Sequence, residues 1–217
     1  MKLPPEDRAR LEKQDEVDIE DILSIFCFAL KIDQAFIVAA RHVFAKSRPD
    51  FGALYLAGLD HAAEHNFWKY IEPEKFENVD AADVTRYGEV IDEYYIYMDE
   101  VLGHLLSLYP LGETAFLIVS DHGHEANPNY DPKSEDHYNR ICSGDHNDAP
   151  DGVLIMAGAD IAAGARLERA TIFDIAPTVL ALMGVPKGAD MPGRVLREAI
   201  DPAFLAAHPP RTVPSYS

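Results

Sequence analysis

Three apolar runs, each ending in or beside metal-binding residue types, constrain this sequence more than any other feature. They are "FGALYLAGLD" at 51–60, "TAFLIVSDHG" at 114–123 and "GVLIMAGADI" at 152–161. A nearly continuous apolar run of this length is typical of a strand buried on both faces of a sheet. The runs alternate with segments of helical periodicity. This order predicts an α/β fold with a mostly parallel sheet flanked by helices.

The segments between the runs show the three- and four-residue apolar spacing of amphipathic helices. Residues 17–46 have a polar break at 31–34, which predicts two short helices. Residues 82–108 predict one long helix, and "TIFDIAPTVLALMGVP" predicts a helix that ends at Gly184.

The rest of the chain lacks such a pattern. Residues 123–151 form a long polar stretch, and a loop of that length in a compact domain is usually functional or disordered. We expect one α/β domain over residues 1–198 and a loosely docked tail over 199–217.

Composition narrows the class of protein. With 217 residues and 47% hydrophobic content, the chain is long enough for one sizeable core. Its net charge of −18 excludes general affinity for a nucleic-acid backbone, although a bound divalent cation would let it accept a substrate phosphate. No apolar run approaches the roughly 18 residues of a membrane helix, and the first residues are charged, so we expect no membrane partner and a cytoplasmic location by default. Cys27 and Cys142 are expected to be unpaired.

Candidate metal ligands lie at the ends of the apolar runs. Asp60 closes the first run, Asp121 and His122 close the second, and His146 precedes the third. Side chains at the carboxyl ends of neighbouring strands converge on one crevice in open α/β sheets. Carboxylate oxygen and imidazole nitrogen are normal donors for Zn²⁺, which polarises phosphoryl oxygens. The sequence therefore predicts a shared metal site.

The motifs occur in the order "YLAGLDHAAEHNFWKY", "FLIVSDHG", "SGDHNDAPDGVLIMAGADI", "DIAPTVLALMGVP" and "DMPGRVL". This order resembles the type I phosphodiesterase and nucleotide pyrophosphatase branch of the alkaline phosphatase superfamily. The resemblance implies an alkaline-phosphatase-like fold. It also implies a zinc-dependent hydrolase that attacks phosphate mono- and diesters through a Thr or Ser nucleophile, assisted by two metals.

The resemblance also implies roles for individual residues. Asp60, His65 and His146 match the ligands of one zinc, which activates water, and Asp121 and His122 match two ligands of a second zinc. Mixed carboxylate and imidazole donors also accept Mn²⁺, so the identity of the metal stays open.

The spacing from Asp60 to His65 departs from the family pattern, because it is five residues where the family has four. A bulge in the opening helical turn would absorb the extra residue. Alternatively, Glu64 is the ligand, or His61 and His65 both face the metal. His124 would either orient a ligand or lie in a solvated loop.

A second departure concerns the nucleophile. The residues before Asp60 include two serines, Ser24 and Ser47, and no threonine, and neither serine has the setting of an activated nucleophile. We therefore expect the amino-terminal side of the fold to be incomplete and this chain alone to be nearly inactive. The alternative is a non-catalytic zinc-binding α/β module. An exposed sheet edge predicts self-association or pairing with a complementing amino-terminal segment.

Overall fold

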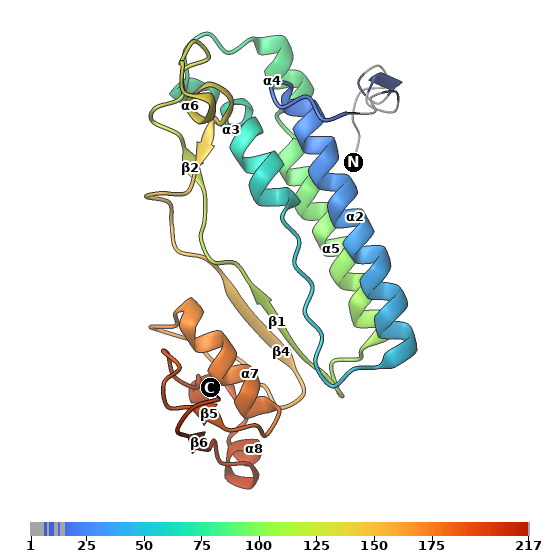
Figure 1. Cartoon of the computed structure of the whole chain (residues 1–217), viewed down its shortest axis with the longest axis vertical. Helices are drawn as coiled ribbons and strands as arrows, with labels where there is room; N and C mark the ends of the chain where they lie inside the picture. The colour runs from blue at the N-terminus through green and yellow to red at the C-terminus, as the bar shows by residue number, and fades with distance from the viewer. Residues whose placement is uncertain (1–6, 8, 11–12, 14–15, 217) are drawn as a thin grey trace. The chain divides into compact units, whose positions relative to one another are not determined.

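The computed structural model describes residues 7, 9–10, 13 and 16–216, without the side chains of residues 62–64 (Figure 1). Contacts divide the chain into two compact units. The first comprises residues 1–108 and 122–151, and the second comprises 109–121 and 152–217. The single domain expected over 1–198 stays a prediction, and the two units are described in turn.

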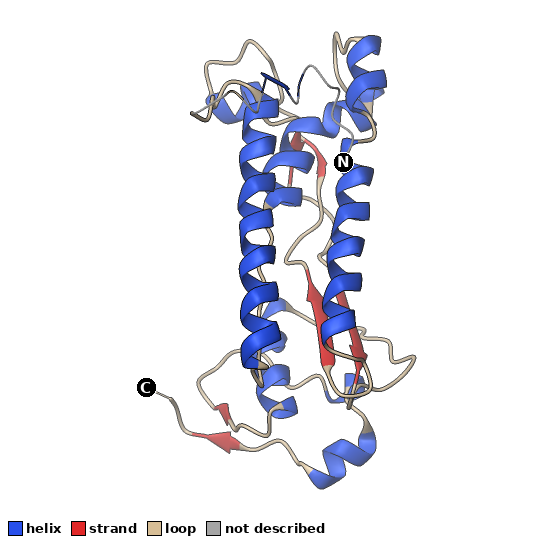
Figure 2. Ribbon diagram, turned by 90° about the vertical axis from the view of Figure 1, so that its right-hand side faces the viewer, coloured by secondary structure: helices blue, strands red, loops and turns tan. Residues whose placement is uncertain are grey.

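The first unit is mostly helical. Two long helices, α2 (Ile22–Ser47) and α5 (Val90–Leu108), run alongside each other in both ribbon views (Figures 1 and 2). Its other elements are short: the π-helix η1 (Leu59–Glu64), α3 (His65–Ile71), the 3₁₀ turn η2 (Pro73–Lys75), α4 (Ala81–Tyr87), β2 (Glu125–Ala126), α6 (His137–Ile141) and β3 (Gly144–Asp145).

Aromatic side chains make the core of this unit. Phe26 of α2, Phe67 of α3 and Tyr94 of α5 are all fully buried. The ring of Phe26 meets Phe67 and Tyr94 edge to face, with centroids 5.3 and 5.9 Å apart. Such contacts add about 1 kcal/mol to the burial of apolar area. They hold α3, which follows η1 directly, against the two long helices.

The two helix predictions for this unit are each wrong in one respect. α2 runs unbroken through residues 31–34, because Asp33 is buried but has partners for its carboxylate. The helix predicted over 82–108 is two helices, and α4 ends at Gly88, whose N–H bonds the carbonyl of Val84. A Cβ at Gly88 would lie 2.7 Å from that carbonyl oxygen, so the close turn requires glycine.

α2 also contradicts the expectation that no apolar run is long enough for a membrane helix. It is long and apolar enough to cross a membrane by length and composition alone. A core helix satisfies the same criterion, and α2 places Leu23 and Phe26 in the aromatic core. A membrane partner is therefore still untested.

The strand predicted at 51–60 is wrong. Residues 51–57 pair with no strand among the described residues, and Tyr55 is 70% exposed. The chain becomes helical at Gly58, where Asp33 Oδ2 accepts the Gly58 N–H at 3.0 Å. An extended apolar run becomes a sheet strand only when a neighbour completes its backbone hydrogen bonds.

The second unit contains two of the three predicted strands. β1 (Ala115–Val119) and β4 (Leu154–Gly158) pair antiparallel, with Ala115 opposite Gly158. The predicted helix is also confirmed, as the 3₁₀ turn η3 (Ile172–Asp174) followed by α7 (Ile175–Leu182), and Gly184 follows it with φ +68°.

The carboxyl-terminal residues are built into this unit. They form η4 (Arg197–Ala199), α8 (Pro202–Ala207) and β6 (Thr212–Val213), which pairs parallel with β5 (Lys187–Gly188). Ile200 is 1% exposed. This segment is thus more closely docked than the expected tail.

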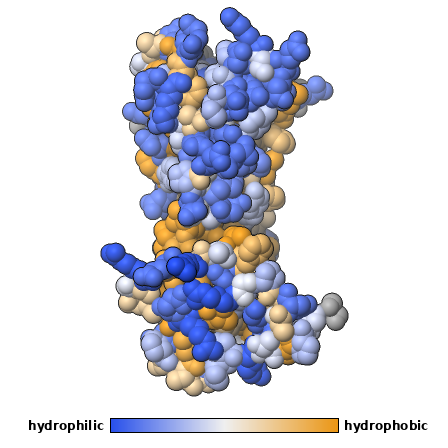
Figure 3. Space-filling model, turned by 90° about the vertical axis from the view of Figure 1, so that its left-hand side faces the viewer, coloured by the Kyte–Doolittle hydropathy of each residue, from blue (hydrophilic) through white to orange (hydrophobic). Residues whose placement is uncertain are grey.

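The chain has α/β content, but a mostly parallel sheet is not confirmed. The described residues form three two-stranded sheets, of which β1–β4 and β2–β3 are antiparallel. A parallel sheet needs adjacent strands joined by crossovers, and the residues expected to supply one such strand, 51–57, are unpaired here. Apolar side chains also reach the surface on the face shown in Figure 3.

Candidate metal centre

The first unit brings four potential ligands together from three segments. Asp60 lies in η1, His122 and His124 precede β2, and His146 follows β3. Each of the four side chains offers one ligand atom, and these atoms all lie within 4.8 Å of one another. A cluster of one carboxylate and three imidazoles matches the donor types that proteins use for Zn²⁺.

Asp60 Oδ1 is the atom that these imidazoles surround. His124 Nε2 lies 3.2 Å from it, while His122 Nε2 and His146 Nδ1 each lie 4.0 Å away. Asp60 Oδ1 and His146 Nδ1 are buried, and neither makes a hydrogen bond within the described part of the chain. Burying polar atoms without partners is costly, and a cation would satisfy both.

The π-helix explains the spacing between Asp60 and His65. In a π-helix, residues five apart are joined by a backbone hydrogen bond and lie on one face, so η1 is the bulge that the spacing predicted. His65 Nδ1 lies 2.7 Å from the backbone oxygen of Asp60 and 3.8 Å from its Oδ1. The buried His65 ring therefore fixes the turn that carries Asp60.

A second group shares the same carboxylate. Asp60, His61 and His65 each offer one ligand atom, and these atoms lie within 4.8 Å of one another. His61 Nδ1 lies 3.4 Å from Asp60 Oδ2, but its side chain is 64% exposed. The exposed His61 thus lies on the Oδ2 side of the carboxylate, whereas the buried His124 lies on the Oδ1 side.

Electrostatics keep the carboxylate ionised. Burial by itself would raise the pKa of Asp60, but the adjacent His124 and the charges of His65 and His61 outweigh burial and lower this pKa to about 2. Burial also lowers the pKa of His65, which favours its neutral form. At neutral pH Asp60 is thus ionised, and His65, which holds its turn, is neutral.

The polar stretch 123–151 is held against α3 by buried hydrogen bonds. Ser143 is fully buried, and its hydroxyl contacts the backbone oxygens of His65 and Asn66 at 3.2 and 3.1 Å. Asn127 donates its backbone N–H to the carbonyl of Ser143 and its side-chain amide N–H to the carbonyl of Cys142, both at 2.8 Å. These bonds place His146, three residues after Ser143, beside η1.

Comparison with known proteins identifies the family. The family model for type I phosphodiesterase / nucleotide pyrophosphatase matches residues 9–178. The chain belongs to this family.

One curated relative of this chain is a phosphoglycerate mutase. A 2,3-bisphosphoglycerate-independent phosphoglycerate mutase of Cereibacter sphaeroides (strain ATCC 17025 / ATH 2.4.3) is 32% identical to it over 102 residues. The match covers 47% of this chain and 18% of the mutase, so the chain spans only a small part of that relative. No solved structure matches.

The structure of this phosphodiesterase family member brings some sequence-predicted residues together and leaves others apart. Asp60, His65, His122 and His146 meet in the first unit. Asp121 belongs to the second unit, so its ligand role stays a prediction, and the side chain of Glu64 lies outside the described part of the chain.

His124 is the residue that sequence reasoning undervalued. Its side chain is 2% exposed and lies against Asp60, so it is not part of a solvated loop. The spacing of the two histidines was a signal. His122 and His124 are two residues apart, and side chains two apart in an extended backbone point to the same side.

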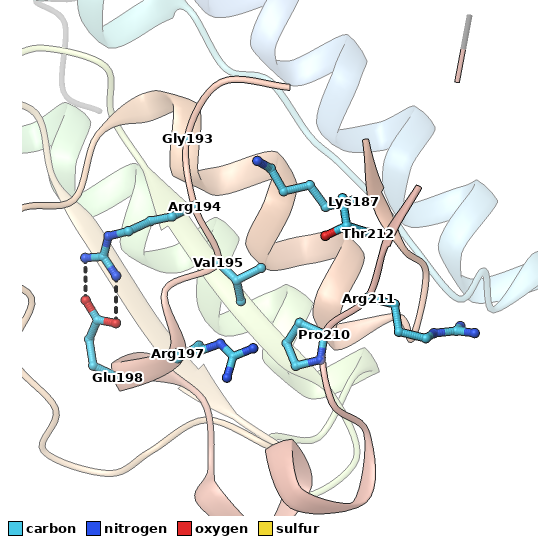
Figure 4. A pocket seen from close by; sticks show the side chains of 9 residues that line it. All are labelled: Lys187, Gly193, Arg194, Val195, Arg197, Glu198, Pro210, Arg211 and Thr212. Carbon is cyan, nitrogen blue, oxygen red and sulfur yellow. Dashed lines mark hydrogen bonds and ion pairs between the residues drawn. The ribbon is translucent and has the colours of Figure 1, made fainter. Parts of the chain in front are cut away.

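A cavity of about 440 Å³ lies elsewhere, in the second unit (Figure 4). Its lining includes four basic side chains, but Arg194 is paired with Glu198 at 2.5 Å and Arg211 bonds Gly184 O at 2.8 Å. None of the clustered Asp and His residues lines it.

Proposed function

We propose that this chain contributes the metal centre of a hydrolase acting on phosphate mono- and diesters, of the phosphodiesterase and nucleotide pyrophosphatase type. The observation that carries the proposal is the set of three imidazole nitrogens within 4.8 Å of Asp60 Oδ1. Family membership supports the reaction class, and the partner is a small phosphate ester.

Zinc fits the centre best. Three nitrogen donors and one carboxylate suit a tetrahedral borderline ion, whereas Mn²⁺ prefers more oxygen donors. When bound, the ion would polarise a phosphoryl oxygen and supply local positive charge in a chain of net charge −18. Asp60 and His146 would hold it, because their buried atoms Oδ1 and Nδ1 lack hydrogen-bond partners within the described residues.

The ligand assignments made from the sequence remain proposals. His65 would complete a site with Asp60 and His146, while Asp121 and His122 would serve a second zinc. The 4.0 Å approach of His122 to Asp60 favours instead a centre that His122 shares.

We further propose that the 217-residue chain alone has only trace activity. The clustered residues are a carboxylate and imidazoles, and none supplies the hydroxyl nucleophile expected for this family. Without covalent catalysis and substrate positioning, a metal ion alone gives slow hydrolysis. A complementing segment or a second copy would have to supply these groups.

Zinc content and hydrolysis measured together test the proposal. We expect tightly bound zinc in the wild type, its loss in His146→Ala, and retention in His104→Ala, an exposed histidine on α5. Hydrolysis of bis(p-nitrophenyl) phosphate should be zinc-dependent but barely measurable. A wild type without zinc would refute the centre, and robust saturable turnover would refute the expectation of trace activity.

The alternative function is a non-catalytic zinc-binding module. The number of available ligands favours it, because four protein ligands leave a tetrahedral ion no position for water. A chelator would then lower the melting temperature of the chain, while zinc would produce no hydrolysis at all.

A further inference from the structure

We propose that one ion binds at Asp60, His122, His124 and His146, with His124 as the fourth ligand, and that His65 orients Asp60 without coordinating. The inference rests on the metal centre of the proposed function and replaces the ligand assignments that the family resemblance implies. It makes the centre mononuclear and closed. Neither of the two zinc sites implied by the family resemblance has this composition.

The separations match a tetrahedral ion. Ligand bonds of about 2.0–2.1 Å at tetrahedral angles place neighbouring ligand atoms roughly 3.3 Å apart. His124 Nε2 already lies 3.2 Å from Asp60 Oδ1, and His122 Nε2 and His146 Nδ1 lie 4.0 Å away. His124 is therefore the imidazole nearest to the tetrahedral separation from Asp60, and the other two exceed that separation by less than about 1 Å.

The His122 ring is oriented as in many metal sites. Its Nδ1 lies 3.0 Å from the backbone oxygen of Gly123. A carbonyl oxygen can only accept, so Nδ1 carries the proton and Nε2, which faces Asp60, keeps its lone pair. Metal-ligating histidines usually donate their other N–H to such a carbonyl, which fixes the tautomer.

Position separates His65 from this ligand set, because the four ligand atoms that lie within 4.8 Å of one another come from Asp60, His122, His124 and His146. Its Nδ1 lies 2.7 Å from the backbone oxygen of Asp60, so this nitrogen must donate a proton there. It is also the His65 nitrogen that lies 3.8 Å from Asp60 Oδ1. A protonated nitrogen has no lone pair for a metal, so the His65 nitrogen nearest to Asp60 cannot coordinate, and we assign His65 the role of holding the π-helical turn.

Packing fixes His124 in place. Its ring lies edge-on to His65, with centroids 5.0 Å apart, and stacks on Trp68 at 6.3 Å. With a side chain 2% exposed, it cannot swing into solvent without repacking these neighbours. A bound ion would thus join the 122–146 stretch to η1, and a water or substrate could reach it only after a ligand leaves.

X-ray absorption at the zinc edge tests this ligand set directly, together with zinc stoichiometry. The variant His124→Phe keeps a ring to pack on Trp68 but removes the nitrogen. The matched variant His65→Gln keeps an N–H donor for the Asp60 carbonyl. Bound cobalt adds a second readout, since four-coordinate cobalt absorbs visible light far more strongly than six-coordinate cobalt.

We expect one zinc per wild-type chain with three imidazole ligands, and intense cobalt absorption. His124→Phe should show two imidazoles, weaker cobalt absorption, and an affinity at least about 100-fold lower, whereas His65→Gln should keep three imidazoles.

Other outcomes would overturn the inference. Two imidazoles per zinc in the wild type, two ions per chain, or loss of an imidazole in His65→Gln but not in His124→Phe would each do so, while leaving the proposed metal centre standing. A wild type that binds no zinc would overturn both. The wild-type count tests the inference even if a variant fails to fold, because fewer than three imidazoles would overturn it, and the two variants decide whether His124 or His65 is among them.

Discussion

Two aspartates of the first unit differ sharply in what surrounds them. Asp33, on α2, is fully buried and fully partnered, because its carboxylate accepts the N–H groups of Ala57 and Gly58, both at 3.0 Å, and the hydroxyl of Tyr94 at 2.6 Å. Asp60 lies two residues after Gly58. Its Oδ1 is buried among imidazoles and accepts no hydrogen bond from the described residues.

The difference separates a structural carboxylate from a binding one. Protein donors satisfy Asp33, and burial together with Asp33 raises the pKa of Tyr94, which keeps this hydroxyl protonated as a donor. Imidazole nitrogens that face Asp60 satisfy it only if protonated or if they share a cation with it. The hydrogen bonds of Asp33 fix where η1 begins, and the position of η1 in turn places Asp60 beside the imidazoles.

The largest expected effect is on folding, from Asp33→Ala. The variant leaves two backbone N–H groups and a buried hydroxyl without their acceptor, which should lower the free energy of unfolding by about 4 kcal/mol. Urea denaturation measures this change. Asp99→Ala, at an exposed position of α5, is the control and should change stability by less than about 0.5 kcal/mol. A loss below about 1 kcal/mol for Asp33→Ala would contradict the structural role.

Asp60→Asn should mainly weaken metal binding, whereas Asp33→Ala mainly lowers stability. Zinc affinity should fall by at least about 100-fold, because a neutral amide replaces the anionic ligand. The melting temperature without metal should fall by less than in Asp33→Ala, since Oδ1 accepts no hydrogen bond from the described residues. Isothermal titration and thermal melting measure the two quantities. A large loss of metal-free stability would mean that Asp60 is structural, like Asp33.

A third carboxylate, Asp174 in the second unit, is expected to make the stability of the protein depend on pH. Burial alone would raise its pKa, but the N–H groups of Arg194 and Thr171 and the Thr171 hydroxyl outweigh burial and lower it. The stability that Asp174 contributes is therefore present above its unfolded pKa of about 3.8 and is lost as pH falls through its lower folded pKa.

Urea denaturation of the wild type and Asp174→Asn between pH 6 and pH 2.5 tests this expectation. The variant should be less stable at pH 6, and its stability should fall less than that of the wild type as the solution is acidified. Parallel pH profiles for the two proteins would argue against a lowered pKa.

The smallest effect should come from His61→Ala. Its imidazole contacts Oδ2, on the exposed side of Asp60, and exposed pairs of this kind contribute between zero and about 1 kcal/mol. Zinc affinity should change by less than about fivefold. A loss comparable to that of Asp60→Asn would place His61 among the ligands and make Oδ2 the binding atom.

Local sequence patterns predicted several elements well. The apolar runs located β1 and β4, and the helical period located α7 with its end before Gly184. The same kind of pattern failed at residues 51–57, where apolar content suggested a strand but no strand in the described part of the chain pairs with it. Pairing depends on residues distant in sequence, and periodicity contains no information about them.

The amino-acid sequence by itself determined which chemistry this chain can offer. The order of its motifs resembled the family that the family model matches, the five-residue spacing after Asp60 allowed the bulge that η1 forms, and the Asp and His residues supplied donor types suited to a metal. These conclusions follow from residue type and local spacing.

Only the tertiary structure decided how those donors are grouped. It buried His124 against Asp60, directed His65 Nδ1 to a backbone carbonyl, and brought His146 to η1 through Ser143. Ligand grouping depends on ring orientation and on distances of a few ångströms between segments more than 50 residues apart in the sequence. Such distances are set by packing and by satisfying buried hydrogen bonds, which no local pattern specifies.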